Sequence, residues 1–181
     1  MEIIFVDKDP DVIRTYQKII GNKSYKRKHY FICCDINRIT TMYEDIDYIV
    51  SPANSYGIMN GGIDEVYMLM FPGIENKVKK AIREKYPETK ELPVGECLSV
   101  PIEKMRRCRI PSIKELICCP TMRVPSDING TDNIYLAMKG LLDFLKLNKR
   151  PIKVVIPGLG TLTGKLPFEE SAEQIKRALD E

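Results

Sequence analysis

The sequence has few of the residues from which most metal sites and catalytic triads are built. It contains a single histidine, His29. One histidine excludes a metal site built from several histidines of this chain, and it leaves only one candidate base for a serine or cysteine nucleophile. No apolar run reaches the roughly 18 to 20 residues that cross a bilayer. We therefore expect no contact with a membrane.

The six cysteines lack the spacing of a zinc site. They form two adjacent pairs, Cys33–Cys34 and Cys118–Cys119, and two single residues, whereas zinc sites use spacings such as C-x2-C. Neighbours on a strand point to opposite faces, so an adjacent pair in a strand-like stretch cannot clamp one metal. The first residues have neither the basic start nor the long apolar stretch of a signal peptide. We expect buried, reduced thiols in a cytoplasmic protein with no metal and no cofactor.

The charge is nearly balanced, with 28 basic and 25 acidic side chains and a formal net charge of +3. Two basic runs, 23–30 and 104–109, contain residue types that contact phosphate backbones. Such runs are more often solvated turns, and the small net charge argues against specific nucleic-acid binding. A length of 181 residues fits a single domain over residues 1–181. We expect it to be a monomer.

Short apolar runs alternate with helical patterns along the chain. Apolar residues that recur every three or four positions indicate helices at 11–20, 74–86, 134–145 and 168–179. The short runs are rich in β-branched residues, as buried strands are, and strands alternating with helices predict an α/β sheet covered on both faces. The expected strands are Glu2–Val6, Tyr30–Cys34, Tyr48–Ser51, Cys97–Pro101, Leu116–Cys119 and Lys153–Pro157.

A glycine-rich loop follows the strand expected at Tyr48–Ser51. It contains Gly61 and Gly62 and leads into Glu65–Phe71, which has a helical composition. Glycines let the backbone approach a ligand closely, and amides that lead into a helix N-terminus form an anion site. The alternative is a flexible connection in which Asp64 only caps the next helix.

A second glycine-rich loop follows the strand expected at Lys153–Pro157. Gly158, Gly160 and Gly164 give G-x-G-x-x-x-G, which differs from the G-x-G-x-x-G of dinucleotide-binding proteins. The phosphate loop of nucleotide triphosphatases is excluded as well, because Leu166 stands where that motif needs serine or threonine. A loop of amides able to wrap phosphates remains, with a plain tight turn as the alternative.

A third loop follows the strand expected at Leu116–Cys119. Its residues Thr121 and Arg123 could meet a ligand or solvent. Ligands of open α/β sheets bind outside the C-terminal strand ends, so the three loops should meet there. The residues alone predict a phosphorylated or pyrophosphate-containing small molecule. Ile102–Ser112 and Arg123–Asp132 fit no element and are expected to be surface loops, the second near the ligand.

The motifs, taken in order, resemble the macro domain family, which binds ADP-ribose. The resemblance implies a three-layer α/β/α sandwich around a mixed, mostly parallel sheet of about six strands. It extends roughly from Asp35 to the end of the chain, and Pro120–Pro125 is similar to a subset of stand-alone microbial and viral-type members. The other matching segments are Asp47–Asn54, Gly61–Asp64, Pro93–Cys97, Pro157–Thr161 and Gly164–Pro167.

The resemblance also implies site residues. Asp35, next to Ile36, would accept a hydrogen bond from the adenine amino group, and Asn54 would contact the distal ribose. Asn54 and Asp64 would be the catalytic pair of a hydrolytic member. The remaining ligand-binding positions would be Gly61, Gly62 and Ile63 of the first loop, Thr121 of the third, and Gly158, Leu159, Gly160, Thr161, Leu162, Thr163 and Gly164 of the second.

Two functions fit these residues. A metal-independent hydrolase would use Asp64 to orient or deprotonate a water at the anomeric carbon, where negative charge also stabilises an oxocarbenium-like transition state. Its substrate would be protein-linked ADP-ribose, or a phosphate or acyl ester of ADP-ribose within NAD metabolism. A non-catalytic reader would bind ADP-ribose or a related nucleotide. Leu162 stands where family members usually have a glycine, and Thr163 lies near a position that is often aromatic in hydrolytic members; both differences favour the reader. Asn54 and Asp64 favour the hydrolase, and this is the function that we expect.

Overall fold

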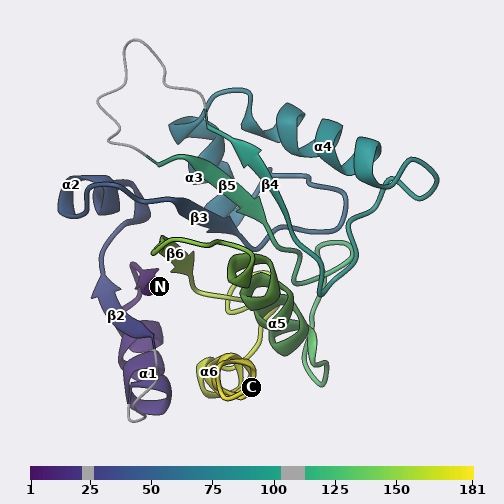
Figure 1. Cartoon of the computed structure of the whole chain (residues 1–181). Helices are drawn as coiled ribbons and strands as arrows, with labels where there is room; N and C mark the ends of the chain where they lie inside the picture. The colour runs from purple at the N-terminus through teal and green to yellow at the C-terminus, as the bar shows by residue number, and fades with distance from the viewer. Residues whose placement is uncertain (22–26, 103–112) are drawn as a thin grey trace.

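The computed structural model of the chain describes residues 1–21, 27–102 and 113–181. Its strands are β1 (Glu2–Asp7), β2 (Lys28–Cys33), β3 (Tyr48–Ser51), β4 (Leu98–Pro101), β5 (Glu115–Cys118) and β6 (Lys153–Pro157). They form a six-stranded sheet in the order β2-β1-β6-β3-β5-β4 (Figure 1). All neighbours are parallel except β4, which pairs antiparallel with β5 at one edge. The predicted mixed, mostly parallel sheet is confirmed.

Helices cover both faces of this sheet, as the alternation of strands and helices predicted. They are α1 (Pro10–Ile20), η1 (Ile36–Arg38), α2 (Ile39–Met42), α3 (Gly62–Met70), α4 (Ile74–Lys85), α5 (Asn133–Lys146) and α6 (Phe168–Leu179). In Figure 1, α1, α5 and α6 lie on one side of the sheet and α3 and α4 on the other. No helix in the described ranges is long and apolar enough to cross a bilayer.

Strand β1 shows how the sheet separates two hydrophobic cores. Ile3 and Phe5 pack with the side chains of α1, α5 and α6, whereas Ile4 and Val6 pack with those of α3 and α4. Successive side chains of a strand point to opposite faces, so a strand covered on both sides needs an unbroken apolar run. This is why β1 was recognisable in the sequence as a run without polar alternation.

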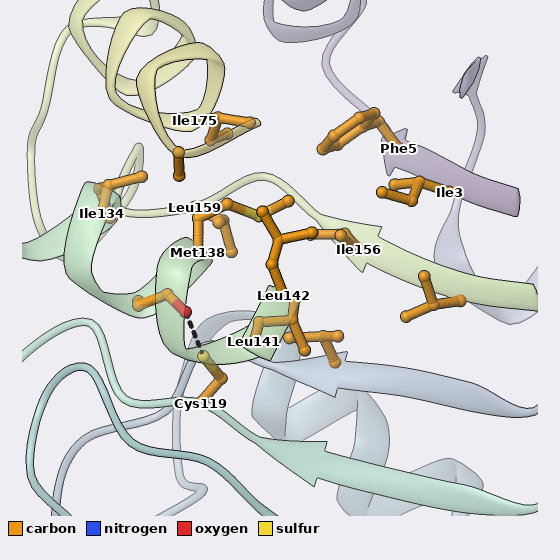
Figure 2. Packing of buried hydrophobic residues seen from close by; sticks show 14 of the residues in the cluster. Ile3, Phe5, Cys119, Ile134, Met138, Leu141, Leu142, Ile156, Leu159 and Ile175 are labelled. Carbon is orange, nitrogen blue, oxygen red and sulfur yellow. Dashed lines mark hydrogen bonds between the residues drawn. The ribbon is translucent and has the colours of Figure 1, made fainter. Parts of the chain in front are cut away.

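The cysteines are divided between the core and the surface. Cys33 is exposed and Cys34 is half-buried at the end of the edge strand β2, so the expectation of buried thiols was wrong for these two. The thiol of Cys119 donates a hydrogen bond of 3.1 Å to the carbonyl oxygen of Ala137 inside the core (Figure 2). Cys108 lies outside the described residues. The buried free thiols are Cys97, Cys118 and Cys119.

Helix α3 begins earlier than the sequence pattern indicated. It starts at Gly62 rather than at Glu65. Glycines carry no apolar side chain, so the periodicity that marks a helix could not extend back over them. Asp64 therefore lies inside the first turn of α3, not before it, and a carboxylate is favoured there by the helix dipole.

Other boundaries differ by one or two residues. The helices η1 and α2 were not predicted, because elements of three and four residues are too short to show a period. The expected loop 123–132 has no regular structure until α5 begins, as predicted. Most of the other expected loop, 103–112, lies outside the described residues. So do the whole second basic run, 104–109, and positions 23–26 of the first basic run, 23–30, the end of which belongs to β2.

Candidate functional site

A cavity of about 300 Å³ lies at the C-terminal ends of the parallel strands. Residues that follow β1, β2, β3, β5 and β6 line it, so the three loops singled out in the sequence do meet. Both proposed catalytic residues and every predicted ligand-binding residue except Leu159 belong to the lining. Sequence reasoning missed several others, among them Asp7, Lys8, Cys34, Ile58, Met122 and Pro125.

The first glycine-rich loop leaves its backbone open toward the cavity. Gly61 is the N-cap of α3, and no side chain caps this helix. Among the described residues, a Cβ atom added at Gly61 or Gly62 would meet no atom within 4 Å beyond the chain neighbours, and Gly62 has φ +60°. The N-terminal amides of a helix have no acceptor within the helix and carry the positive end of its dipole. This edge of the cavity can therefore bind an anion.

The second glycine-rich loop is packed against the protein instead. Gly160 has φ +71°, and a Cβ there would lie 2.8 Å from Cδ1 of Ile134 and 2.9 Å from Cδ1 of Ile128. A Cβ on Gly164 would lie 2.6 Å from the carbonyl oxygen of Gly160. These two glycines are required by the conformation and packing of the loop itself.

A closed ring of hydrogen bonds holds the second loop from behind. The amide of Leu159 donates to the hydroxyl of Tyr16 (3.1 Å), and the hydroxyl of Ser171 donates to the carbonyl oxygen of Leu159 (2.7 Å). The Tyr16 hydroxyl therefore donates to Ser171 Oγ, 2.6 Å away. Burial raises the pKa of Tyr16 to about 12, so this donor keeps its proton.

The ring explains why Leu159 does not line the cavity. Its side chain is buried in the core beside Met138 and Ile156 (Figure 2), and its amide and carbonyl are both used by the ring. Leu159 was predicted to contact a ligand, but its side chain, amide and carbonyl group all make contacts inside the protein. Leu162, by contrast, lines the cavity with a side chain that is 71% exposed, so it lies at the mouth and does not fill the interior.

The side chain of Asn54 holds the first loop in shape. Its Oδ1 accepts hydrogen bonds from the amides of Tyr56 (3.1 Å) and Ile58 (3.2 Å), and its Nδ2 donates to the carbonyl oxygen of Ile58 (2.7 Å). A carboxamide has two N–H donors. Within the part of the chain that the structure describes, one N–H of this buried residue therefore remains for a ligand.

Arg123 braces the same loop from outside the cavity. Its guanidinium donates to both carboxylate oxygens of Glu91 (2.8 and 2.7 Å) and to the hydroxyl of Tyr56 (2.7 Å). Neither Arg123 nor Tyr56 is among the residues that line the cavity. Thr121 does line it, but its hydroxyl donates to the carbonyl oxygen of Pro52 (3.0 Å). The sequence left open whether Thr121, Arg123 and Tyr56 meet a ligand. In the structure the polar groups of these side chains bond to other groups of the protein.

Asp64 is the most unusual ionisable group of the cavity. Its side chain is only 7% exposed, and its Oδ1 accepts a hydrogen bond of 2.5 Å from the hydroxyl of Ser51. Burial raises the pKa of Asp64 to about 7, although the hydrogen bond from Ser51 acts in the opposite direction. Sequence reasoning missed Ser51, because it lies inside a buried strand and was read as part of the apolar run.

A second carboxyl group, that of Asp7, lies at the end of β1 beside the second loop. Burial raises its pKa, and hydrogen bonds from the amides of Asp9 and Gly158 only partly offset this effect. The amide of Gly158 thus faces a protein carboxyl group. Asp7 is the last residue of β1, at the same edge of the sheet as the three predicted loops, so the rule for strand ends could have found it.

Comparison with known proteins agrees with this architecture. The Macro domain family matches residues 50–175 of the chain. The chain belongs to the macro domain family. An uncharacterised protein of Aquifex aeolicus (strain VF5) is 33% identical over 129 residues, which is 71% of this chain and 69% of that protein.

Solved macrodomains share the fold at low sequence identity. The macrodomain of Mycobacterium tuberculosis DarG superposes with a TM-score of 0.63 and 20% identity, covering 81% of this chain and 86% of that one. A variant of the Oceanobacillus iheyensis macrodomain, solved with ADPR (ADP-ribose), has a TM-score of 0.59 and 19% identity, covering 77% of this chain and 72% of that one. The three-layer fold implied by the sequence motifs is confirmed.

Proposed function

We propose that this macro domain binds ADP-ribose in its cavity and hydrolyses an ADP-ribosyl linkage. The observation that carries the proposal is the buried carboxyl group of Asp64, which lines the same cavity as two glycine-rich loops. The Oceanobacillus iheyensis relative with ADPR bound supports the choice of ligand. The substrate would carry ADP-ribose on a protein side chain, or as a phosphate or acyl ester.

The two loops would hold the diphosphate without a basic side chain. The N-terminus of α3, with Gly61 and Gly62, would bind one phosphate group through backbone amides and the helix dipole. The amides that follow Gly160 would face the other phosphate. Asp35 would then accept from the adenine amino group at one end, and Asn54 and Asp64 would lie near the distal ribose at the other.

The chemistry would be displacement at the anomeric carbon by water. The water oxygen forms a bond to this carbon as the bond to the leaving oxygen breaks, and the leaving oxygen keeps the electron pair and takes up a proton. Asp64 accepts the proton from water and, in its ionised form, stabilises positive charge that develops on the sugar. With a pKa of about 7, the carboxyl group can both accept and return a proton at neutral pH.

Turnover of a defined substrate tests the proposal. The wild type should bind ADP-ribose in a calorimetric titration and release free ADP-ribose from a protein that carries it as an ester. Asp64→Asn keeps the shape of the side chain and the acceptor for Ser51, so binding should change little, while kcat should fall by about 10²-fold or more. Turnover of Asp64→Asn at the wild-type rate would refute the catalytic role.

Asp35→Asn is the matched control. It also removes one carboxylate from the cavity lining, but at the end assigned to adenine. We expect it to raise KM with little effect on kcat, because a group that binds ground state and transition state equally does not change the chemical step. An equal loss of kcat in both variants would argue against the assigned orientation of the ligand.

A non-catalytic reader is the second candidate, favoured by Leu162. Its 71% exposed side chain stands at the mouth of the cavity, where it could contact the group to which ADP-ribose is attached. A reader would bind ADP-ribosylated protein but release no ADP-ribose at any pH. The absence of ADP-ribose binding at millimolar ligand would refute both functions.

A further inference from the structure

The carboxyl group of Asp64 is held by a hydroxyl group from the neighbouring strand. The Ser51 hydroxyl, at the end of β3, donates to Oδ1 of Asp64 over 2.5 Å, and the Ser51 side chain is fully buried. Within the described ranges no residue hydrogen-bonds to Oδ2, and Asp64 lines the cavity. One oxygen is thus anchored in the protein, and the other remains for water or a ligand.

The other described polar groups around Asp64 do not donate a hydrogen bond to its carboxylate. Tyr67, one turn further along α3, donates its hydroxyl to the carbonyl oxygen of Val50 at 3.0 Å. Cys118, at the end of β5, is fully buried, and burial holds the pKa values of Tyr67 and Cys118 well above their usual range, so both are neutral. Among the described residues, Asp64 forms no ion pair with a lysine or arginine. Ser51 therefore supplies the side-chain hydrogen bond that stabilises the Asp64 carboxylate, in addition to the dipole of α3.

We propose that Ser51 is a positioning residue for the hydrolysis: its hydroxyl turns the Asp64 carboxylate toward the cavity and stabilises the ionised form that accepts the proton. This inference rests on the proposed function. Asn54 does not have this role in the described structure, because its hydrogen bonds go to Tyr56 and Ile58 of its own loop and none goes to Asp64. A hydroxyl donor stabilises an ionised carboxylate more than a protonated carboxyl group, because hydrogen bonds to charged acceptors are stronger than those to neutral ones.

The decisive experiment is the pH dependence of kcat for Ser51→Ala. Loss of the donor should move the acid limb of the profile up by about one pH unit, the shift expected for one hydrogen bond to a charged group. Activity should therefore fall by about tenfold near pH 6 and return toward the wild-type value near pH 9. A purely structural role would lower activity by the same factor at every pH.

Ser171→Ala is the matched control. Ser171 is also fully buried, and its hydroxyl belongs to the ring behind the second loop, with no hydrogen bond to Asp64. Its removal should change KM or stability without moving the midpoint of the pH profile. The proposal is overturned if Ser51→Ala has the wild-type midpoint, or if both serine variants move it equally.

A titration without substrate separates this inference from the proposed function. The carboxyl carbon of Asp64 can be followed by NMR against pH in ligand-free wild type and Ser51→Ala. A higher midpoint in Ser51→Ala supports the role of the serine in setting the charge of Asp64, even if no substrate is turned over. Equal midpoints refute that role, even if the wild type proves to be a hydrolase.

Discussion

The two glycine-rich loops of this cavity differ in what their glycines do at the cavity itself. In the first loop, a Cβ added to Gly61 or Gly62 would point into open space, although the φ of +60° at Gly62 itself favours glycine. In the second, a Cβ on Gly160 or Gly164 would meet protein atoms at 2.8 Å or less. Where it leads into α3, the first loop thus keeps space free outside the protein, although Gly57 earlier in that loop is packed, with a Cβ position 2.7 Å from Cγ1 of Val78. The glycines of the second loop that follow Leu159 are needed to fold against their own neighbours.

The difference extends to the residues that support each loop. The second loop is fixed from behind by the ring of Tyr16, Leu159 and Ser171. The first loop leads into an uncapped helix N-terminus, and two residues later Asp64 is buried with a raised pKa. The hydrogen bonds of the ring therefore stabilise the fold at the second loop, whereas the buried carboxyl group of Asp64 destabilises it beside the first loop when it is ionised. Four substitutions test this contrast.

The largest effect should come from Asp64→Asn, beside the first loop. The pKa of Asp64 in the folded protein is about 7 against an ordinary value of 3.8. Its contribution to stability is therefore complete below pH 4 and is lost as the pH rises to 7. Asp64→Asn should raise the free energy of unfolding by up to about 4 kcal/mol at pH 8 and much less at pH 4. Urea denaturation at both pH values measures this, and an equal effect at both would contradict the burial argument.

Gly160→Ala, in the second loop, should be the most destabilising of the four. The positive φ and the contacts with Ile128 and Ile134 together should lower the free energy of unfolding by about 3 kcal/mol. This corresponds to a fall in Tm of roughly 6–12 °C for a domain of this size. A thermal melt is sufficient, and an unchanged Tm would show that the second loop is as open as the first.

Tyr16→Phe should have an intermediate effect on the second loop. It leaves the Leu159 amide without its acceptor and Ser171 Oγ without the hydroxyl that donates to it, while Ser171 still donates to the Leu159 carbonyl oxygen. This should lower the free energy of unfolding by about 2 kcal/mol. Tyr30→Phe is the control, because the described structure gives the Tyr30 hydroxyl no hydrogen bond, and its effect should be within about 0.5 kcal/mol. Equal losses in the two variants would mean that the ring does not hold the loop.

The smallest effect on stability should come from Gly61→Ala. Gly61 has φ −164°, an extended conformation that any residue adopts, so Tm should not change. The added methyl group would occupy space beside the helix N-terminus, and ADP-ribose affinity should fall by about tenfold. Calorimetry and a thermal melt on one sample measure both. Destabilisation comparable to that of Gly160→Ala would remove the contrast between the loops.

Local patterns were sufficient to predict the strands and most helices. A strand such as β6 is covered on both faces, so its sequence after Lys153 is apolar and can be recognised without knowing its neighbours. The positions of the loops followed from the rule that ligands bind at the C-terminal strand ends. Motif resemblance then identified Asn54 and Asp64 as residues of the cavity. The short helices η1 and α2 and the start of α3 at Gly62 were not predicted, because neither a very short helix nor a glycine adds to a periodic pattern of apolar residues.

The contacts that distinguish the residues of the site could not be read in this way. Tyr16 meets Leu159 across 143 residues of chain, and nothing in either local sequence marks the other. In the sequence, Ser51 is one residue of an apolar strand. Only in the folded protein does the first turn of α3 place Asp64 within hydrogen-bond distance of the Ser51 hydroxyl.

The sequence by itself determined the strands, the order of the loops and the family, because these depend on local hydrophobicity and on motifs within short segments. Only the tertiary structure decided which glycines face open space and which are packed, and which hydroxyl governs the charge of Asp64. Those properties depend on burial and on hydrogen bonds between distant segments, and both arise only when the strands and helices have assembled.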